Sequence, residues 1–200
     1  ATWTSIKVAV LTIFVAVPIG TMAAYGLVNS SSRTSKILFP IFISPMMVPI
    51  ILVAIGLFYF FVQLKLVGSV LGLVIGHSLV ALPLVLIIVF SALKNYDMNQ
   101  EKVARSLGAG RFRAFREITL PQIKFSIISA SLIAFLTSFD EIIISLFVAG
   151  GDNSTITRSM FLALRDQIDP TIAAISTILI IISSGLLIIV QLLGNNKDQH

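Results

Sequence analysis

The sequence has 200 residues, of which 56% are hydrophobic and only 12% are charged. Soluble domains carry roughly 25% charged residues, so this composition indicates an integral membrane protein. The chain has no cysteine, which excludes disulfides and thiolate metal sites, and its two histidines, His77 and His200, lie too far apart in sequence to suggest a metal pair. We therefore interpret the formal net charge of +5 as a topology signal and expect no nucleic-acid partner and no cofactor.

Five apolar stretches reach the roughly 20 residues that a transmembrane helix needs. In chain order they cover residues 6–28, 37–62, 66–93, 125–149 and 172–193. They predict an all-α fold, a polytopic transmembrane helix bundle, and we expect residues 1–200 to form one transmembrane domain. Two connectors between them are long, at residues 94–124 and 150–171.

The second and third spans contain residues that affect how helices bend and pack. In the second span three prolines each remove a backbone donor and predict a kinked helix: Pro40, Pro45 and Pro49. In the third span three glycines at four-residue spacing predict close approach of another helix: Gly68, Gly72 and Gly76. His77 follows these glycines, and we expect it to be a hydrogen-bonded packing residue.

The distribution of basic residues predicts an orientation, because cytoplasmic loops are enriched in Lys and Arg. With the 94–124 connector in the cytoplasm, ten basic residues lie inside: Arg33, Lys36, Lys94, Lys102, Arg105, Arg111, Arg113, Arg116, Lys124 and Lys197. Four lie outside: Lys7, Lys65, Arg158 and Arg165. We therefore predict that the chain starts on the extracytoplasmic side and that its C-terminus is cytoplasmic. We also expect a further helix upstream of the first span.

The 94–124 connector has the pattern of two short helices separated by a turn. Asp97 is placed to cap a helix over residues 98–107, and Gly108 is placed to end it. One side of this helix is apolar and charged residues surround that side: Val103, Ala104 and Leu107, with Glu101, Lys102 and Arg105. Residues 111–118 predict a second helix before Pro121. The pattern suits both an amphipathic bracket on lipid headgroups and a protein-docking element.

Two adjacent acids, Asp140 and Glu141, lie inside the fourth span, where an ionisable side chain costs roughly 2.5–3.5 kcal/mol. On a continuous helix the polar residues of this region share one arc, which we expect to face the bundle or an aqueous pathway: Thr137, Ser138, Asp140, Glu141 and Ser145. The acids then either line a substrate pathway or pair with a helix of this subunit or of a partner.

The connector resembles the EAA loop of the membrane subunits of binding-protein-dependent ABC importers. In that loop Glu-Ala-Ala is followed by Gly and, nine residues later, by Ile-x-Leu-Pro; here the matching positions are Ala104, Gly108, Ile118, Leu120 and Pro121. Lys102 stands where the family has Glu and Val103 replaces the first Ala, while Glu101 places an acid one residue earlier. The flanking stretches "GHSLVALPLVLIIVFSAL" and "SFDEIIISLFV" are similar to the spermidine/putrescine branch.

This resemblance implies a type I importer permease in the bacterial inner membrane. It implies two cytoplasmic ATPase subunits, a second membrane subunit that is the same or related, an extracytoplasmic solute-binding protein, and a small solute such as a polyamine. The resemblance implies that the following residues contact the ATPase: Glu101, Lys102, Val103, Ala104, Arg105, Leu107, Gly108 and Ala109. Among them Val103, Ala104 and Leu107 would be buried anchors, and Glu101 or Arg105 would lie on a polar rim. The candidate pathway residues are Asp140, Glu141, Thr137 and Ser138.

Two other classes of function compete with this interpretation. A secondary transporter or channel would use Asp140 and Glu141 as ion ligands and would transport without an ATPase. A membrane-embedded enzyme would need a nucleophile or metal constellation, and the sequence shows none. The sequence also lacks the phosphate-binding motif G-x-x-x-x-G-K-[ST], so we expect the chain not to be an enzyme and ATP hydrolysis to belong to a partner.

Overall fold

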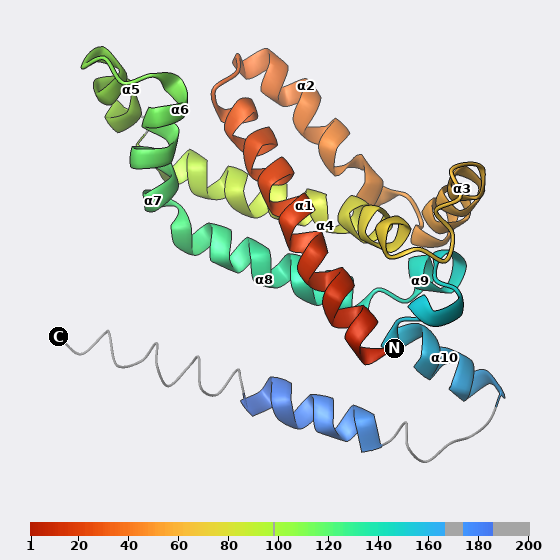
Figure 1. Cartoon of the computed structure of the whole chain (residues 1–200). Helices are drawn as coiled ribbons and strands as arrows, with labels where there is room; N and C mark the ends of the chain where they lie inside the picture. The colour runs from red at the N-terminus through yellow and green to blue at the C-terminus, as the bar shows by residue number, and fades with distance from the viewer. Residues whose placement is uncertain (98, 167–173, 186–200) are drawn as a thin grey trace. The chain divides into compact units, whose positions relative to one another are not determined.

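The computed structural model describes residues 1–97, 99–166 and 174–185. The chain forms two compact units, Ala1–Arg158 and Ser159–His200. All regular secondary structure of the described residues is helical, which confirms the predicted all-α class. Figure 1 shows the helices of the first unit, which contains the candidate sites.

Two helices of the first unit are long enough to cross a bilayer unaided. Helix α1 (Thr2–Val28) has 27 residues and α4 (Val70–Asn95) has 26. At 1.5 Å per residue each is about 40 Å long, more than the roughly 30 Å of a hydrocarbon core. They confirm the first and third predicted spans.

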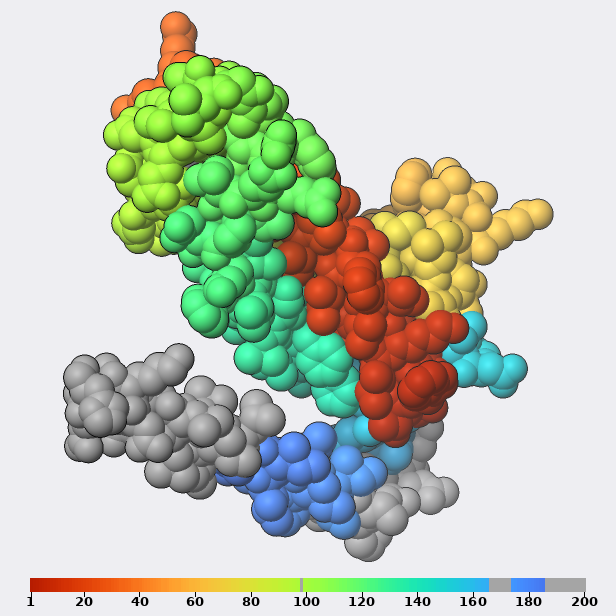
Figure 2. All heavy atoms as spheres, turned by 60° about the vertical axis from the view of Figure 1, so that its left-hand side comes forward, coloured from red at the N-terminus to blue at the C-terminus, as the bar shows by residue number. Residues whose placement is uncertain are grey.

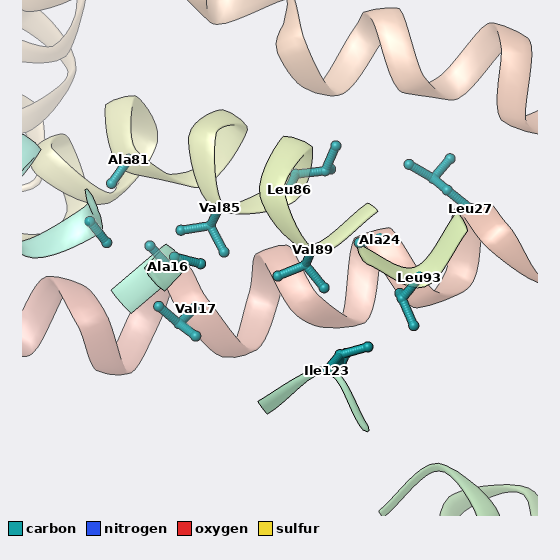
Figure 3. Packing of buried hydrophobic residues seen from close by; sticks show 12 residues of the cluster. Ala16, Val17, Ala24, Leu27, Ala81, Val85, Leu86, Val89, Leu93 and Ile123 are labelled. Carbon is teal, nitrogen blue, oxygen red and sulfur yellow. The ribbon is translucent and has the colours of Figure 1, made fainter. Parts of the chain in front are cut away.

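One of the two core clusters of this unit joins α1, α4 and α8 (Lys124–Asp140), and it combines leucines and valines with many alanines. Buried alanines come from all three helices: Ala16, Ala24, Ala81, Ala130 and Ala134. Figure 3 shows Val85 and Val89 of α4 directed toward α1. Small residues let helix backbones approach closely, which is the main way that helices associate in a lipid environment.

The second predicted span is broken. Helix α2 (Ser32–Ile43) ends in a 3₁₀ turn, Ser44–Met47, and α3 (Ile50–Gln63) begins after Pro49, with a change of direction of 92°. The prediction of one helix over residues 37–62 is therefore wrong, whereas the kink predicted from the prolines is confirmed. With 12 and 14 residues, neither half alone reaches the length of a span.

The fourth predicted span is also interrupted. Helix α8 ends at Asp140, Glu141 and Ile142 leave the helical path, and α9 (Ile143–Val148) begins directly after them. A 3₁₀ turn, Gly151–Asn153, and α10 (Ile156–Asp166) follow. Of the predicted span at 172–193, helix Ala174–Gly185 belongs to the second unit, and the rest lies outside the described residues.

The connecting segments of the first unit meet at its two opposite ends. At one end the Gly68 N–H donates to the Val148 carbonyl at 2.8 Å, and the Ile156 N–H donates to Ser5 Oγ at 2.8 Å. The 94–124 connector lies at the other end, beside the turn between α1 and α2 (Figure 1). The turn at residues 29–31 and the 94–124 connector therefore share one end, and the turns near Gly68 and Ile156 share the other.

The three glycines at and before the start of α4 only partly serve helix packing. Gly68 lies in the preceding turn with φ of +77° and not on the helix, so the prediction is wrong for this residue. A Cβ on Gly72 would lie 2.4 Å from the Leu66 carbonyl oxygen, which belongs to that same turn. A Cβ on Gly76 would lie 2.8 Å from Ile144 Cγ2, so this glycine does allow close approach of α9.

The packing of α1 on α4 predicts the effect of a single methyl group at Gly20. A Cβ there would lie 2.7 Å from Val85 Cγ1 and 3.1 Å from Val85 Cβ, and Val85 is fully buried and β-branched. We expect Gly20→Ala to destabilise the protein by about 1–3 kcal/mol, as overpacking does. The measurement is the thermal unfolding midpoint in detergent.

Gly26→Ala is the matched control on the same helix, because no atom lies within 4 Å of its added Cβ. Its midpoint should stay unchanged or rise, since alanine favours helices over glycine by roughly 0.8–1.0 kcal/mol. Equal midpoints for the two variants would contradict the packing of α1 on α4 at this position.

Candidate functional site

The 94–124 connector forms a helical segment, which we call the coupling segment, at one end of the first unit. It contains α5 (Asn99–Ser106), α6 (Arg111–Ala114), a π-helical turn, Phe115–Thr119, and α7 (Leu120–Gln122). This confirms the predicted helix over residues 98–107 and a second helical stretch after the Gly108 turn. The prediction that the second helix ends before Pro121 is wrong, because helical structure continues through Pro121 to Gln122. In the space-filling view of Figure 2 the segment, coloured lime to green, covers much of that end of the unit, beside orange atoms of α2.

Both ends of α5 are closed as the sequence predicts. The Asn99 N–H donates to Asp97 Oδ1 at 3.0 Å, which satisfies a donor at the start of the helix. At the other end Gly108 has φ of +94°, its N–H donates to the Arg105 carbonyl, and the Ala109 N–H donates to the Ala104 carbonyl. This pair of bonds is the Schellman motif, which needs a left-handed residue and therefore favours glycine.

One face of α5 presents apolar side chains to the outside. Val103 is 59% exposed and Leu107 is 84% exposed, one helical turn apart. Phe112 of α6 is exposed as well, and Lys102 and Arg105 surround this face. Ala104 and Ala109 are half-buried. Exposed apolar side chains with a charged rim are the anatomy of a protein interface.

The opposite face of α5 is anchored in the protein by Glu101. This side chain is only 2% exposed, and both of its carboxyl oxygens accept hydrogen bonds, one from the Tyr25 hydroxyl of α1 and one from Thr119 Oγ1 at 2.6 Å. The ring of Phe115 lies against Tyr25, with centroids 4.6 Å apart. The prediction that Glu101 lies on an exposed contact rim is therefore wrong, because its carboxyl group is used inside the subunit.

The charges of this region also act on Tyr96, just past the end of α4. Burial, with smaller contributions from the negative charges of Glu101 and Asp97, raises the pKa of the Tyr96 phenol above its ordinary value. The phenol therefore stays neutral at physiological pH.

Exposed Arg113 and Glu117 form a surface ion pair at 3.0 Å, which adds little stability.

The acids of the fourth predicted span lie where its backbone breaks. Glu141 Oε1 accepts the Ile144 N–H at 2.8 Å, and the Glu141 carbonyl accepts from Ser145 Oγ at 3.0 Å and from Thr157 Oγ1 at 3.2 Å. These contacts satisfy polar groups that the interruption exposes. The predicted polar arc assumed one continuous helix from Thr137 to Ser145. Because the helix ends at Asp140, Ser145 does not lie on the same arc of that helix.

Asp140 and Glu141 differ in environment. Asp140 is exposed, whereas Glu141 is half-buried against the start of α9. Within residues 1–97, 99–166 and 174–185 neither acid forms an ion pair, so the predicted pairing with another helix of this subunit is not found there. Thr137, one turn before Glu141, is half-buried.

A buried network of polar side chains lies beside the same break and is centred on His77. His77 Nδ1 lies 2.8 Å from Ser138 Oγ, and His77 Nε2 lies 3.2 Å from Ser145 Oγ. Thr12 Oγ1 of α1 lies 3.2 Å from Ser138 Oγ. His77 is thus the hydrogen-bonded packing residue that we predicted. Ser138 is 3% exposed, so the prediction that it faces a substrate pathway is wrong for this conformation.

Sequence reasoning missed several residues of these sites, among them Tyr25, Thr119 and Thr12. Tyr25 and Thr119 reach Glu101 across 76 and 18 positions, and Thr12 reaches Ser138 across 126. No local pattern could have indicated these pairs. Thr119 lies at the variable position between Ile118 and Leu120, so the loop motif does not single it out.

Comparisons with known proteins agree with the resemblance of the connector. Residues 16–199 match the family described as "Binding-protein-dependent transport system inner membrane component". The spermidine/putrescine transport system permease protein PotC of Escherichia coli is 28% identical over 195 residues, which cover 98% of this chain and 74% of the relative.

Two further relatives are slightly more identical over shorter stretches. The PotC homolog of Mycoplasma genitalium is 31% identical over 183 residues, 90% of this chain and 64% of that protein. The putrescine transport system permease protein PotI of Escherichia coli is 30% identical over 183 residues, 88% of this chain and 65% of that protein. The matches confirm the predicted similarity to importer permeases.

The contacts of Glu101 predict a difference between neighbouring residues of α5. Glu101→Ala should destabilise the protein by about 1–3 kcal/mol, because the half-buried Tyr25 hydroxyl and the buried Thr119 hydroxyl lose their acceptor. Lys102→Ala is the matched control, since Lys102 is exposed and such changes stay within about 0.5 kcal/mol. The measurements are the unfolding midpoint and the rate of tryptic cleavage after Arg105. Equal values for the two variants would contradict the anchoring role.

Proposed function

Because this chain belongs to the family of inner membrane components of binding-protein-dependent transport systems, we propose that its coupling segment docks on a cytoplasmic ATPase subunit that drives import. Membership makes the chain a multi-pass inner-membrane permease subunit and not the ATPase. One observation carries the docking proposal: α5 is anchored inward through Glu101 while Val103 and Leu107 remain exposed outward.

A docking element must be held firmly if it is to transmit movement. The Glu101 contacts connect α5 directly to α1 and to the π-helical turn. Helix α1 in turn packs along α4 and α8 through the buried alanines and valines. A displacement of α5 by an ATPase would therefore be passed to the three helices that form the core, since a packed interior transmits strain.

The assembly that we propose has two ATPase subunits, two membrane subunits and an extracytoplasmic solute-binding protein. Docking anchors on this chain are Val103 and Leu107, with Lys102 and Arg105 at the rim and Ala104, Gly108 and Ala109 shaping the end of α5. The positive-inside distribution supports a cytoplasmic coupling segment and a cytoplasmic C-terminus. The second membrane subunit is either a second copy or a related chain.

We propose a polyamine as the transported solute. The relatives described above include permeases named for spermidine and putrescine. In the assigned orientation Asp140 and Glu141 lie in the outer half of the bundle, toward the side from which a binding protein delivers its solute. Carboxylates attract a cation more strongly in a low-dielectric cavity than in bulk water. Thr137 lies beside them and is the remaining candidate for this pathway.

The turn after α5 gives a sharp test of docking. No atom lies within 4 Å of a Cβ added at Gly108 or at Gly110, so the Cβ of a new side chain has open space at both positions. Gly108 is left-handed, with φ of +94°, whereas Gly110 is extended, with φ of −64°. Gly108→Val should therefore cost about 1–2 kcal/mol in this turn and weaken co-purification with the ATPase by roughly 5–30-fold.

Gly110→Val is the control, because a β-branched residue accepts extended backbone. It should retain ATPase binding, and both variants should insert into the membrane. ATPase binding and ATP-driven uptake that are normal in Gly108→Val would contradict docking through α5. Uptake by this chain without any ATPase would instead support the secondary-transporter alternative.

The two acids at the helix break should respond differently to loss of charge. Asp140→Asn removes the charge of an exposed group, so polyamine uptake into vesicles should fall several-fold while the yield of complex is unchanged. Glu141→Gln keeps an amide oxygen that can accept the Ile144 N–H, so the break should stay intact. Glu141→Ala removes that acceptor and should lower the unfolding midpoint. Normal uptake in Asp140→Asn, Glu141→Gln and their double variant would remove the acids from the pathway.

A further inference from the structure

A cavity lies where α1 ends, α2 begins and α4 ends, and neither the exposed face of α5 nor the acids Asp140 and Glu141 line it. Its volume is about 490 Å³, and it is lined by the last turn of α1, the first turns of α2 and the last turns of α4. These helix ends lie at the same end of the first unit as the coupling segment (Figure 1). This inference takes the side of the membrane from the proposed function. In that orientation the cavity lies at the level of the cytoplasmic headgroups.

One part of this cavity is cationic. Lys36 of α2 and Lys94 of α4 both line it, together with the serines Ser30, Ser32 and Ser35, and within residues 1–97, 99–166 and 174–185 no acidic residue lines it. Among the residues that the structure describes, neither lysine forms an ion pair with a carboxylate. Two ammonium groups and nearby hydroxyls can donate hydrogen bonds to the oxygens of a phosphate.

The other part of the cavity is apolar. The rings of Phe39 and Phe90 both line it, with centroids 4.7 Å apart, and Leu27 and Val28 of α1 complete the wall. Lys94 Nζ lies 5.0 Å from the centre of the Phe90 ring, so the charged and apolar parts are adjacent. A free inorganic anion would use only the lysines, whereas an amphiphile would use both parts.

Helix α2 is also poorly packed against the rest of the unit. None of its residues is buried, and its one capping contact at the N-terminus comes from Ser31 within the same turn. A ligand in the cavity would contact α2 and α4 together and would shield apolar surface that is otherwise exposed. Basic pockets between membrane helices on the cytoplasmic side are typical binding sites for anionic lipid headgroups.

We propose that this cavity binds the phosphate headgroup of an anionic phospholipid of the cytoplasmic leaflet. Lys36 and Lys94 bind the phosphate, and the start of an acyl chain lies along Phe39 and Phe90. Bound in this way, the lipid holds α2 against α4 and stabilises the bent second span. The site is separate from the ATPase-docking face of α5 and from the acids at Asp140 and Glu141.

The experiment measures lipid retention by the purified transporter complex in detergent, using native mass spectrometry and the unfolding midpoint. The probes are phosphatidylglycerol, which is anionic, phosphatidylcholine, which is zwitterionic, and inorganic phosphate. Phosphatidylglycerol should be retained and should raise the midpoint, whereas phosphatidylcholine should do neither. The double variant Lys36→Gln/Lys94→Gln should retain roughly 20–30-fold less phosphatidylglycerol, because each lysine contributes about a fivefold factor.

The matched control removes two exposed charges outside the cavity, in the double variant Arg116→Gln/Lys124→Gln. It should retain phosphatidylglycerol like the wild type. Equal losses in the two double variants would overturn the proposal, since binding would then follow overall surface charge. Equal retention of the two lipids would overturn it as well. If inorganic phosphate raised the midpoint as phosphatidylglycerol does, the cavity would be a site for free phosphate and the lipid assignment would be wrong.

Failure of this proposal is distinguishable from failure of the proposed function. Lipid retention is measured without transport or ATP, so it stands even if α5 does not dock on an ATPase. Conversely, loss of phosphatidylglycerol specificity would leave ATPase binding and its dependence on Gly108 unchanged.

Discussion

The rest of the coupling segment depends on one buried carboxyl group. Glu101 accepts hydrogen bonds from α1 and from the π-helical turn, and this fixes α5 in one rotation about its axis. That rotation places Val103 and Leu107 outward, where they are exposed. A buried polar group without partners is costly, so the three side chains specify each other's positions. The exposed apolar face is therefore a consequence of what the opposite face of α5 must bury.

The interrupted helices follow from a similar constraint. Backbone groups inside a membrane must be satisfied within the protein, so a break persists only where side chains or neighbouring turns supply partners. At Glu141 the residue's own carboxyl group accepts the Ile144 N–H, and its carbonyl accepts two hydroxyl groups. The His77 network fills the adjacent space. The second span bends instead at prolines, which lack a donor that would need satisfying.

The sequence could predict features that depend on neighbouring residues along the chain. The spacing of apolar residues predicted α1 and α4, Asp97 and Gly108 predicted the ends of α5, and the prolines predicted the kink. It could not predict that α8 ends at Asp140, because "SFDEIIISLFV" is apolar enough to continue as a helix and the reason for the break lies in contacts with Thr157 and α9. The prediction that Ser145 lies on the same helical arc as Asp140 and Glu141 is wrong for that reason.

By itself, then, the sequence determined that this is a helical membrane protein with a polar helical connector whose motif resembles that of importer permeases, because hydrophobic length, turn residues and loop spacing are all local properties of the chain. Only the tertiary structure decided which side chains of that loop are buried, so Glu101 turned inward while Lys102 stayed exposed. It likewise decided that Ser138 joins His77 and that Lys36 and Lys94 share one cavity. Each of these depends on residues far apart in the chain, whose proximity is set by how α1, α2, α4 and α8 pack and not by any pattern within one segment.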